Sequence, residues 1–98
     1  MFARRVSLHL QPNVAGDFAR TMENQIIPLL RKQHGFRDEL VLVNAKASRA
    51  EAISLWDSQE NAENFAKGQY LQMLQILGNS IKDKPEVETY QVTTTTLH

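Results

Sequence analysis

The chain begins with a stretch, residues 2–11, in which apolar and polar positions alternate. The side chains expected on its apolar face are Phe2, Val6, Leu8 and Leu10. Alternation with a period of two is typical of a strand that is buried on one side. We therefore predict a half-buried first strand.

A helical pattern follows from about residue 14 to residue 34. Its apolar positions recur every three or four residues, at Val14, Phe18, Met22, Ile26 and Leu29/Leu30. We expect Asn13 to cap this helix and Gly35 to supply the left-handed residue that ends it. Pro28 lacks a backbone donor and crowds the carbonyl group four positions earlier, so it predicts a bend in the helix.

Residues 36–45 contain four consecutive apolar side chains, Leu40-Val41-Leu42-Val43. Because these side chains would point to both faces of a sheet, the stretch predicts a central strand that is covered on two sides. Residues 50–56 alternate again, and a short polar connection precedes them. The two strands are therefore expected to form an antiparallel hairpin.

The second half of the chain repeats the order of helix and strand. Ser58 is expected to cap a short helix that Gly68 interrupts. A second helical segment, residues 70–81, follows directly. The β-branched residues in 87–96 predict the last strand, so the complete order is β-α-β-β-α-β.

This order is that of the split βαβ fold, an α+β, ferredoxin-like architecture in which helices cover one face of a four-stranded antiparallel sheet. One such domain accounts for residues 1–98, a length near the commonest domain size. The other face of the sheet would be apolar and open, because the second strand is apolar on both sides. A second copy of the chain is the simplest cover, so we expect a homodimer through the sheet faces.

Composition and charge narrow the classes of function. The chain is 42% hydrophobic, contains no cysteine, and balances 11 Lys and Arg against 11 Asp and Glu. A neutral chain does not favour nucleic acid or an anionic membrane as partner, and the absence of cysteine excludes disulfides and thiol chemistry. The apolar runs are far shorter than the ~20 residues of a bilayer span, and polar residues interrupt any signal-peptide core. We expect a cytoplasmic protein.

Two further classes of function, metal or cofactor binding and RNA recognition, are disfavoured by particular residues. The three histidines are scattered and match no metal-binding spacing, so we expect neither a metal site nor another bound cofactor. RNA recognition motifs share the predicted topology, but they stack bases on a basic and aromatic strand. The corresponding strand here, residues 50–56, is acidic and apolar.

Several short motifs occur in a recognisable order. Trp56-Asp57-Ser58-Gln59-Glu60 leads from the third predicted strand into a capped helix. The other stretches are Pro28-Leu29-Leu30-Arg31, Gly35-Phe36, Tyr70 and Val87-Glu88-Thr89-Tyr90-Gln91-Val92. Together they resemble the W-x-S-x-E element and its neighbours in the antibiotic biosynthesis monooxygenase (ABM) superfamily, over nearly the whole chain. The resemblance implies a dimeric α/β barrel with a pocket in each subunit between sheet and helices.

Members of this superfamily carry out cofactor-independent oxygenation of aromatic polyketides, quinol oxidation and haem degradation, and many have no established activity. The haem-degrading members use a Trp and a His on the second helical region. Phe65 stands where that Trp is expected, and residues 60–81 contain no histidine. We therefore expect no haem chemistry.

The residues that are candidates for a ligand pocket are Trp56, Tyr70, Phe65, Asn44, Phe18, Met22, Met73 and Leu77. The oxygenase members of the superfamily hold a phenolic substrate with polar groups such as those of Asn, Tyr and Trp. Asn44, Tyr70 and Trp56 are residues of these types, although they are not aligned onto that role one by one. The remaining candidates lie on helical stripes that meet the sheet, where they either line an apolar cavity or fill the core. Trp56 is likewise either a pocket wall or a core aromatic residue. No catalytic residue is assigned.

Two hypotheses about function follow. The first is a small enzyme that oxygenates a flat aromatic or quinol-like molecule without metal or flavin, after the substrate has been deprotonated. The alternative is a non-catalytic dimer that binds a hydrophobic metabolite. Oxygen uptake with quinol substrates distinguishes them.

Overall fold

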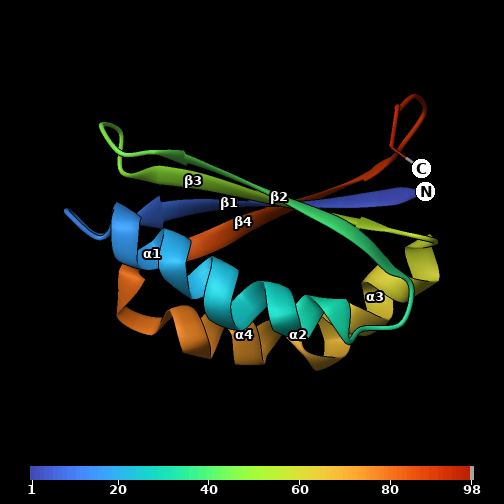
Figure 1. Cartoon of the computed structure of the whole chain (residues 1–98), viewed down its shortest axis with the longest axis horizontal. Coiled ribbons are helices and arrows are strands. Elements are labelled where there is room, and N and C mark those ends of the chain that lie inside the picture. The colour runs from blue at the N-terminus through green and yellow to red at the C-terminus, as the bar shows by residue number, and fades with distance from the viewer. Residues whose placement is uncertain (98) are drawn as a thin grey trace.

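Four antiparallel strands form one sheet, and the helical segments pack against one of its faces (Figure 1). The elements in chain order are β1 (Phe2–Leu10), α1 (Ala15–Thr21), η1 (Met22–Ile26), α2 (Ile27–Arg31), β2 (Phe36–Asn44), β3 (Arg49–Trp56), α3 (Gln59–Gly68), α4 (Tyr70–Leu77), η2 (Gly78–Ser80) and β4 (Ile81–Gln91). This computed structural model describes residues 1–97, so His98 lies outside the described residues. The predicted α+β, ferredoxin-like fold with helices on one face is confirmed.

The strands are ordered β2-β3-β1-β4, so β1 and β3 are the central strands. The expectation that the second strand is central is wrong, because β2 forms one edge of the sheet. Its apolar residues do point to both faces. Val41 packs against the core, whereas Leu40 and Leu42 are 55% and 48% exposed on the opposite face. The apolar run thus reflects a sheet whose second face is apolar and uncovered within one chain.

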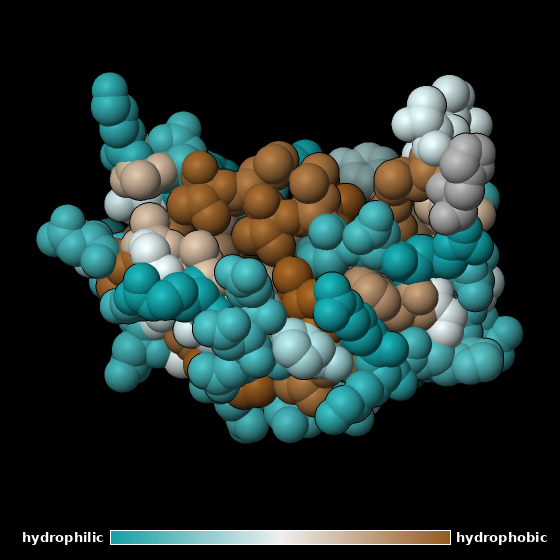
Figure 2. Space-filling model, viewed as in Figure 1, coloured by the Kyte–Doolittle hydropathy of each residue, from teal (hydrophilic) through white to brown (hydrophobic). Residues whose placement is uncertain are grey.

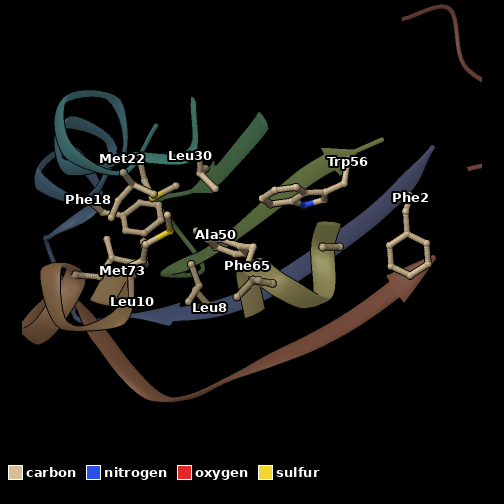
Figure 3. Close-up of a cluster of buried hydrophobic side chains, with 14 residues drawn as sticks. Phe2, Leu8, Leu10, Phe18, Met22, Leu30, Ala50, Trp56, Phe65 and Met73 are labelled. Carbon is tan, nitrogen blue, oxygen red and sulfur yellow. The ribbon is translucent and has the colours of Figure 1, made fainter. Parts of the chain in front are cut away.

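The alternation predicted for the first strand is confirmed. Phe2, Val6 and Leu8 of β1 are buried under the helices. Side chains of the sheet and the helices form one core, which comprises Phe2, Val6, Leu8, Leu10, Phe18, Met22, Ile26, Leu30, Ala50, Trp56, Ala62, Phe65, Met73 and Leu77 (Figure 3). Removal of this apolar surface from water is the main favourable term in folding.

The first helix is widened in its middle. The π-helical turn η1 joins α1 to α2 without a break. Pro28 lies in the first turn of α2, where its missing N–H costs least. The wide turn gives room to the carbonyl group of Asn24, which a proline four residues later would otherwise crowd. The disruption expected at Pro28 therefore takes the form of a π-helical turn.

The same turn keeps one stripe of side chains against the sheet. The buried residues of this helix are spaced four apart, at Phe18, Met22, Ile26 and Leu30. In a regular α-helix each four-residue step rotates the side chain by about 40°, because a turn holds about 3.6 residues. Three such steps would carry the last side chain about 120° away from the first. One wider turn reduces this drift, so all the residues of the stripe stay buried.

Helix capping differs from the prediction at one helix and agrees at another. Asn13 is not the N-cap of α1, because Val14 occupies that position without a side-chain hydrogen bond. Asn13 instead has a φ of 63°, a left-handed conformation that asparagine adopts more readily than most residues, and it turns the chain after β1. Ser58 caps α3 as predicted, and its hydroxyl group accepts a hydrogen bond from the backbone N–H of Asn61.

Gly35 leads from the first helix into β2 with a φ of 80°, as the left-handed stop requires. The helix itself ends earlier than predicted, at Arg31. A Cβ atom on Gly35 would lie 2.2 Å from Cγ of Asn61 in α3. The carbonyl group of Gly35 also accepts a hydrogen bond of 2.8 Å from the backbone N–H of Asp57. Glycine at this position therefore allows the start of β2 to pack closely on the loop that begins α3.

The last strand begins and ends earlier than predicted. β4 spans Ile81–Gln91 rather than residues 87–96, and the preceding helix ends at Leu77. The pairing of β4 with β1 is irregular near Asp83, which has a φ of 65°. Pro85 lies in the same stretch. Because β4 is an edge strand, it tolerates a proline whose missing N–H group is not needed for pairing with a neighbouring strand. The turn-forming residues thus produce a bulge inside a strand.

Candidate functional site

Trp56 belongs to a group of aromatic side chains on the helix side of the sheet, which comprises Phe36, Trp56, Phe65 and Tyr70. Its ring centroid is 5.0 Å from that of Phe65 and 5.6 Å from that of Phe36. Tyr70 contacts the other side of Phe65, with ring centroids 6.3 Å apart. The structure therefore brings three predicted pocket residues together and adds Phe36, to which the sequence pattern gives no role.

Arg4 places a cation inside this aromatic group. It is only 5% exposed, and its guanidinium carbon lies 4.0 Å from the ring centroid of Tyr70 and 5.5 Å from that of Phe65. Cation–π contacts of this kind are stronger away from water. Burial lowers the pKa of Arg4, and Tyr70 and Glu39 oppose that shift. Within residues 1–97 no carboxylate forms an ion pair with Arg4.

A short chain of hydrogen bonds connects the indole ring to the backbone of β1. Nε1 of Trp56 donates to Oγ of Ser54 over 2.9 Å, and this hydroxyl group donates to the carbonyl oxygen of Arg4 over 3.4 Å. Arg4 and Ser54 are directly opposite each other in the sheet. The indole N–H is thus satisfied in the protein interior, which holds the ring in one orientation.

Glu39 lies on the helix side of the sheet, on the same face as Val41, because side chains alternate along β2. The pairing of β2 with β3 shifts between Phe36 and Asp38, so Arg37 is an extra residue in the strand. Side chains alternate without interruption from Glu39 to Val41, so the effect of the extra residue is to place Phe36 on the helix side together with Glu39. Glu39 pairs with Ser54, whose side chain also lies on that side.

The carboxyl group of Glu39 is incompletely paired. Its Oε1 atom is buried and has no hydrogen-bond partner in the described part of the chain. Burial raises the pKa of Glu39 to about 8, repulsion from Asp38 adds to this shift, and the charge of Arg4 opposes it. At neutral pH this carboxyl group is therefore mostly protonated, unlike an ordinary glutamate.

Glu39 also lines a cavity of ≈ 430 Å³ between β2 and the first helix. The lining residues are Ile27, Arg31, Phe36, Arg37, Asp38 and Glu39. Because Phe36 contacts Trp56, this cavity adjoins the aromatic group. A larger hollow of ≈ 660 Å³ farther along β2 shares Ile27 and Arg31 with it. Both volumes are in the range of small-molecule sites.

None of the predicted pocket residues is among those that line this cavity. Phe18, Met22 and Met73 gather at the end of the core opposite Trp56 (Figure 3), and Leu77 is buried as well. Met22 also lines the larger hollow. The contact of these residues with a ligand stays a prediction.

Asn44 is separated from the aromatic group, at the exposed end of β2. Its Oδ1 atom accepts a hydrogen bond of 3.1 Å from the backbone N–H of Ala47, in the turn that leads to β3. This contact gives Asn44 a role in the hairpin turn. Its place in a ligand pocket stays a prediction.

Alternation alone does not identify Arg4 and Glu39 as site residues. Arg4 gives a weak signal, because it is a charged residue on the apolar face between Phe2 and Val6. Glu39 also gives a weak signal, because it alternates with Val41 and Val43 and is therefore a charged residue on the apolar face of β2. Both positions depend on strand register, which propensities do not reveal.

On the face of the sheet that the helices leave open, several polar side chains are joined by hydrogen bonds. Arg5 on β1 donates two hydrogen bonds, of 3.1 and 3.2 Å, to Glu51 on β3, and Ser7 donates a third of 2.6 Å. The hydrogen bond from Arg5 is the main cause that lowers the pKa of Glu51. Large exposed apolar side chains on this face are Leu40, Leu42 and Tyr90. Figure 2 shows the hydrophobic patch along β2.

Other kinds of site are absent from the described residues. No three His, Cys, Asp or Glu side chains within residues 1–97 are grouped so that they could hold a metal ion. No helix in the same range has both the length and the apolar character needed to cross a membrane. The ionisable side chains that line the cavity are those of Arg31, Arg37, Asp38 and Glu39. Arg4 does not line it but is close enough to Glu39 to affect the pKa of that carboxyl group.

The fold is one that solved oxygenase structures share. A protein of Bordetella bronchiseptica, named as a candidate antibiotic biosynthesis monooxygenase, is 18% identical, with a TM-score of 0.79 over 95% of this chain and 97% of that one. A monooxygenase of Streptomyces coelicolor in complex with nanaomycin D is 14% identical, with a TM-score of 0.79 over 99% and 91% of the two chains. SnoaB, a cofactor-independent oxygenase of Streptomyces nogalater, is 13% identical, with a TM-score of 0.76 over 97% and 95%.

These likenesses confirm the α+β, ferredoxin-like fold that the sequence predicts. Because the identities are only 13% to 18%, they establish a shared fold and leave the activity of this chain to be argued from its site. No protein-family model matches the sequence, and no curated protein matches it.

The buried carboxyl group of Glu39 predicts a stability that falls as the pH rises. The pKa is about 8 in the folded protein, against 4.5 for an unperturbed glutamate. Between these values the unfolded chain loses the proton first, so the folded state binds more protons and the free energy of unfolding decreases with pH. At about 1.4 kcal/mol per pKa unit, we expect a loss on the order of 3 kcal/mol across this range, after relaxation around the charge.

Urea denaturation of the wild type and of Glu39→Gln at several pH values measures this loss. The variant is neutral at every pH, so most of the decrease is expected to disappear. Glu63→Gln, a change of the same kind at an exposed position on α3, is expected to behave as the wild type. Equal pH dependence in the wild type and in Glu39→Gln would contradict a buried carboxyl that titrates near 8.

Proposed function

We propose that the chain is an ABM-type monooxygenase that acts without a cofactor on a small aromatic or quinol-like molecule. The observation that carries the proposal is the cavity lined by Phe36 and Glu39, with Trp56 packed against Phe36 and Arg4 close enough to Glu39 to affect its pKa. The fold is shared with an oxygenase that is described as cofactor-independent. Such a reaction begins with deprotonation of the substrate, whose electron-rich anion then reacts with dioxygen.

The site favours an anion of this kind in two ways. Phe36 lines the cavity and offers a flat apolar surface to a ring, and the fully buried Trp56 packs against Phe36 and helps to exclude water. The guanidinium group of Arg4 supplies positive charge from a buried position, where it acts more strongly than it would in water. The chain thus combines desolvation of the substrate with stabilisation of its negative charge.

We propose that the working unit is a homodimer formed through the open sheet face. Leu40, Leu42 and Tyr90 support this proposal, because large apolar side chains on a sheet face are seldom left in water. The same face of a second copy is a self-complementary cover. Two sheets packed in this way would form the α/β barrel that the sequence resemblance implies. The absence of cysteine fits a cytoplasmic location.

Oxygen consumption with a panel of quinols and polycyclic phenols tests the activity. We expect the wild type to consume oxygen with at least one of them, in the presence of a metal chelator and without added flavin. Arg4→Met keeps the aliphatic part of the side chain but removes the charge, so we expect kcat to fall by about 10²–10³-fold. Arg20→Met, at an exposed position on α1, is the matched control and should leave kcat unchanged.

The second candidate function is that of a non-catalytic dimer that binds a hydrophobic metabolite. It is favoured by the burial of Trp56 and Phe65, which fill the core more than they line a cavity. A ligand that raises the melting temperature while no quinol or phenol consumes oxygen would support this candidate over the enzyme.

A further inference from the structure

Glu39 is the acid in this cavity that lacks a partner. Buried carboxyl oxygens normally have a hydrogen-bond donor, yet Oε1 of Glu39 has none among residues 1–97. The neighbouring acid, Asp38, differs in both respects. It is exposed, and its Oδ1 atom accepts a hydrogen bond of 2.8 Å from the backbone N–H of Glu39. Of the two carboxyl groups that line the cavity, only that of Glu39 is buried with an unmet hydrogen bond.

The position of Glu39 is built into the strand. Its side chain alternates with that of Val41 and so lies on the helix side, in the layer that contains Ser54 and Arg4, and the bulge at Arg37 brings Phe36 to that side as well. Phe36, at the start of the same bulge, lines the cavity and contacts Trp56. Bulges of this kind often direct a side chain into a site. The result is an acid beside an aromatic wall, with a cation nearby.

We propose that Glu39 accepts the proton of a ring hydroxyl group on the ligand in this cavity, and that Arg4 stabilises the oxyanion that results. The inference rests on the proposed function and names its base. In the step, the O–H bond of the ligand breaks and a new O–H bond forms on the carboxylate of Glu39. The negative charge passes from the carboxylate to the ligand oxygen, and no electron is exchanged with any other group.

The charged surroundings of Glu39 suit this role. Arg4 on β1 favours its ionised form, whereas burial and Asp38 on β2 favour the protonated form. Arg31 on α2 and Arg37 on β2 also line the cavity, and Arg37 is paired with Asp57 at 3.1 Å. The balance leaves the pKa of Glu39 at about 8, close to the pH at which a general base is most effective.

The first test is the pH dependence of turnover. With a substrate from the oxygen-uptake panel, kcat of the wild type is expected to rise with pH and to level off above about 8. Glu39→Gln keeps the shape of the side chain but cannot accept a proton. It is expected to lower kcat by about 10²–10⁴-fold and to abolish the rise with pH. Glu63→Gln, on the exposed face of α3, is the control and should retain the wild-type profile.

The second test needs no turnover. Phenol is titrated under nitrogen, and binding is followed by the fluorescence of Trp56, the only tryptophan of the chain, which contacts the cavity through Phe36. Binding to the wild type is expected to tighten about tenfold as Glu39 ionises, because an ionised carboxylate accepts a stronger hydrogen bond from the hydroxyl group. Anisole, which has the same ring and no transferable proton, should show no such change. Glu39→Gln should bind phenol equally at every pH.

The two tests distinguish a wrong assignment of Glu39 as the base from a wrong assignment of the oxygenase activity. If Glu39→Gln is folded and turns over with the wild-type rate and pH profile, the proposal for Glu39 is wrong while the oxygenase stands. If the wild type consumes no oxygen but phenol binding follows the ionisation of Glu39, the proposed activity fails and the hydroxyl-binding role of Glu39 is supported. If phenol and anisole bind alike at every pH, the inference is overturned.

Discussion

Replacing Leu42 by lysine is expected to convert a homodimer into a folded monomer. Leu42 is 48% exposed on the open sheet face. In a dimer of two identical faces the interface would bury one lysine from each subunit. Each unpaired ammonium group costs several kcal/mol when it is taken out of water. In the monomer the lysine would lie in solvent opposite Glu51, which the sheet tolerates. Sedimentation should therefore give twice the chain mass of 11.2 kDa for the wild type and one chain mass for the variant.

Leu71→Lys is the matched control for this experiment. Leu71 is 67% exposed on α4, on the helix side of the sheet, so the same change there should leave the dimer intact. A wild type that sediments as a compact monomer at micromolar concentration would contradict the dimer. A Leu42→Lys variant that stays dimeric would show that the open face is not the interface.

Replacing Trp56 by alanine is expected to lower the free energy of unfolding by about 3–5 kcal/mol. The side chain is fully buried, packs on Phe36 and Phe65, and donates a hydrogen bond to Ser54. The substitution removes this packing and leaves a void in the core. Trp56→Phe keeps most of the buried area and loses the hydrogen bond, so a smaller decrease of about 1–2 kcal/mol is expected. Urea unfolding followed by far-UV circular dichroism measures both, because fluorescence loses its only tryptophan.

The size of this effect distinguishes the two interpretations of Trp56. A core aromatic residue leaves a closed void when it is truncated, and the loss is then large. Truncation of a residue in the wall of an open pocket lowers the free energy of unfolding less, because water enters the new space. A decrease well below about 2 kcal/mol for Trp56→Ala would therefore favour the pocket wall.

Periodicity in the sequence predicted much of the fold. The alternation at Phe2, Val6 and Leu8 correctly identifies the buried face of β1, and Ser58 and Gly35 have the local conformations that their residue types favour. These features depend on a few neighbouring residues, so they can be inferred from the chain alone. The aromatic group around Trp56 follows in part, since Phe65 and Tyr70 also lie on recognisable helical stripes.

The remaining features depend on single-residue irregularities that no periodic pattern contains. The bulge at Arg37 decides that Phe36 lies on the helix side together with Glu39, and the irregular pairing near Asp83 allows β4 to begin at Ile81. The edge position of β2 depends on strand order, which local sequence does not encode. The site residues Arg4 and Glu39 both belong to this class, because strand register brings them together.

The π-helical turn η1 holds one more residue than an α-helical turn, so it marks a place where related proteins are expected to differ in length. A relative without proline at the position of Pro28 has no need of the wider turn. Superposition of such a relative should leave a single-residue gap within Met22–Ile26, with the buried positions on either side still equivalent. An alignment that forbids gaps inside helices would instead shift Leu30 and the residues up to Gly35 by one position, and so compare buried positions with exposed ones.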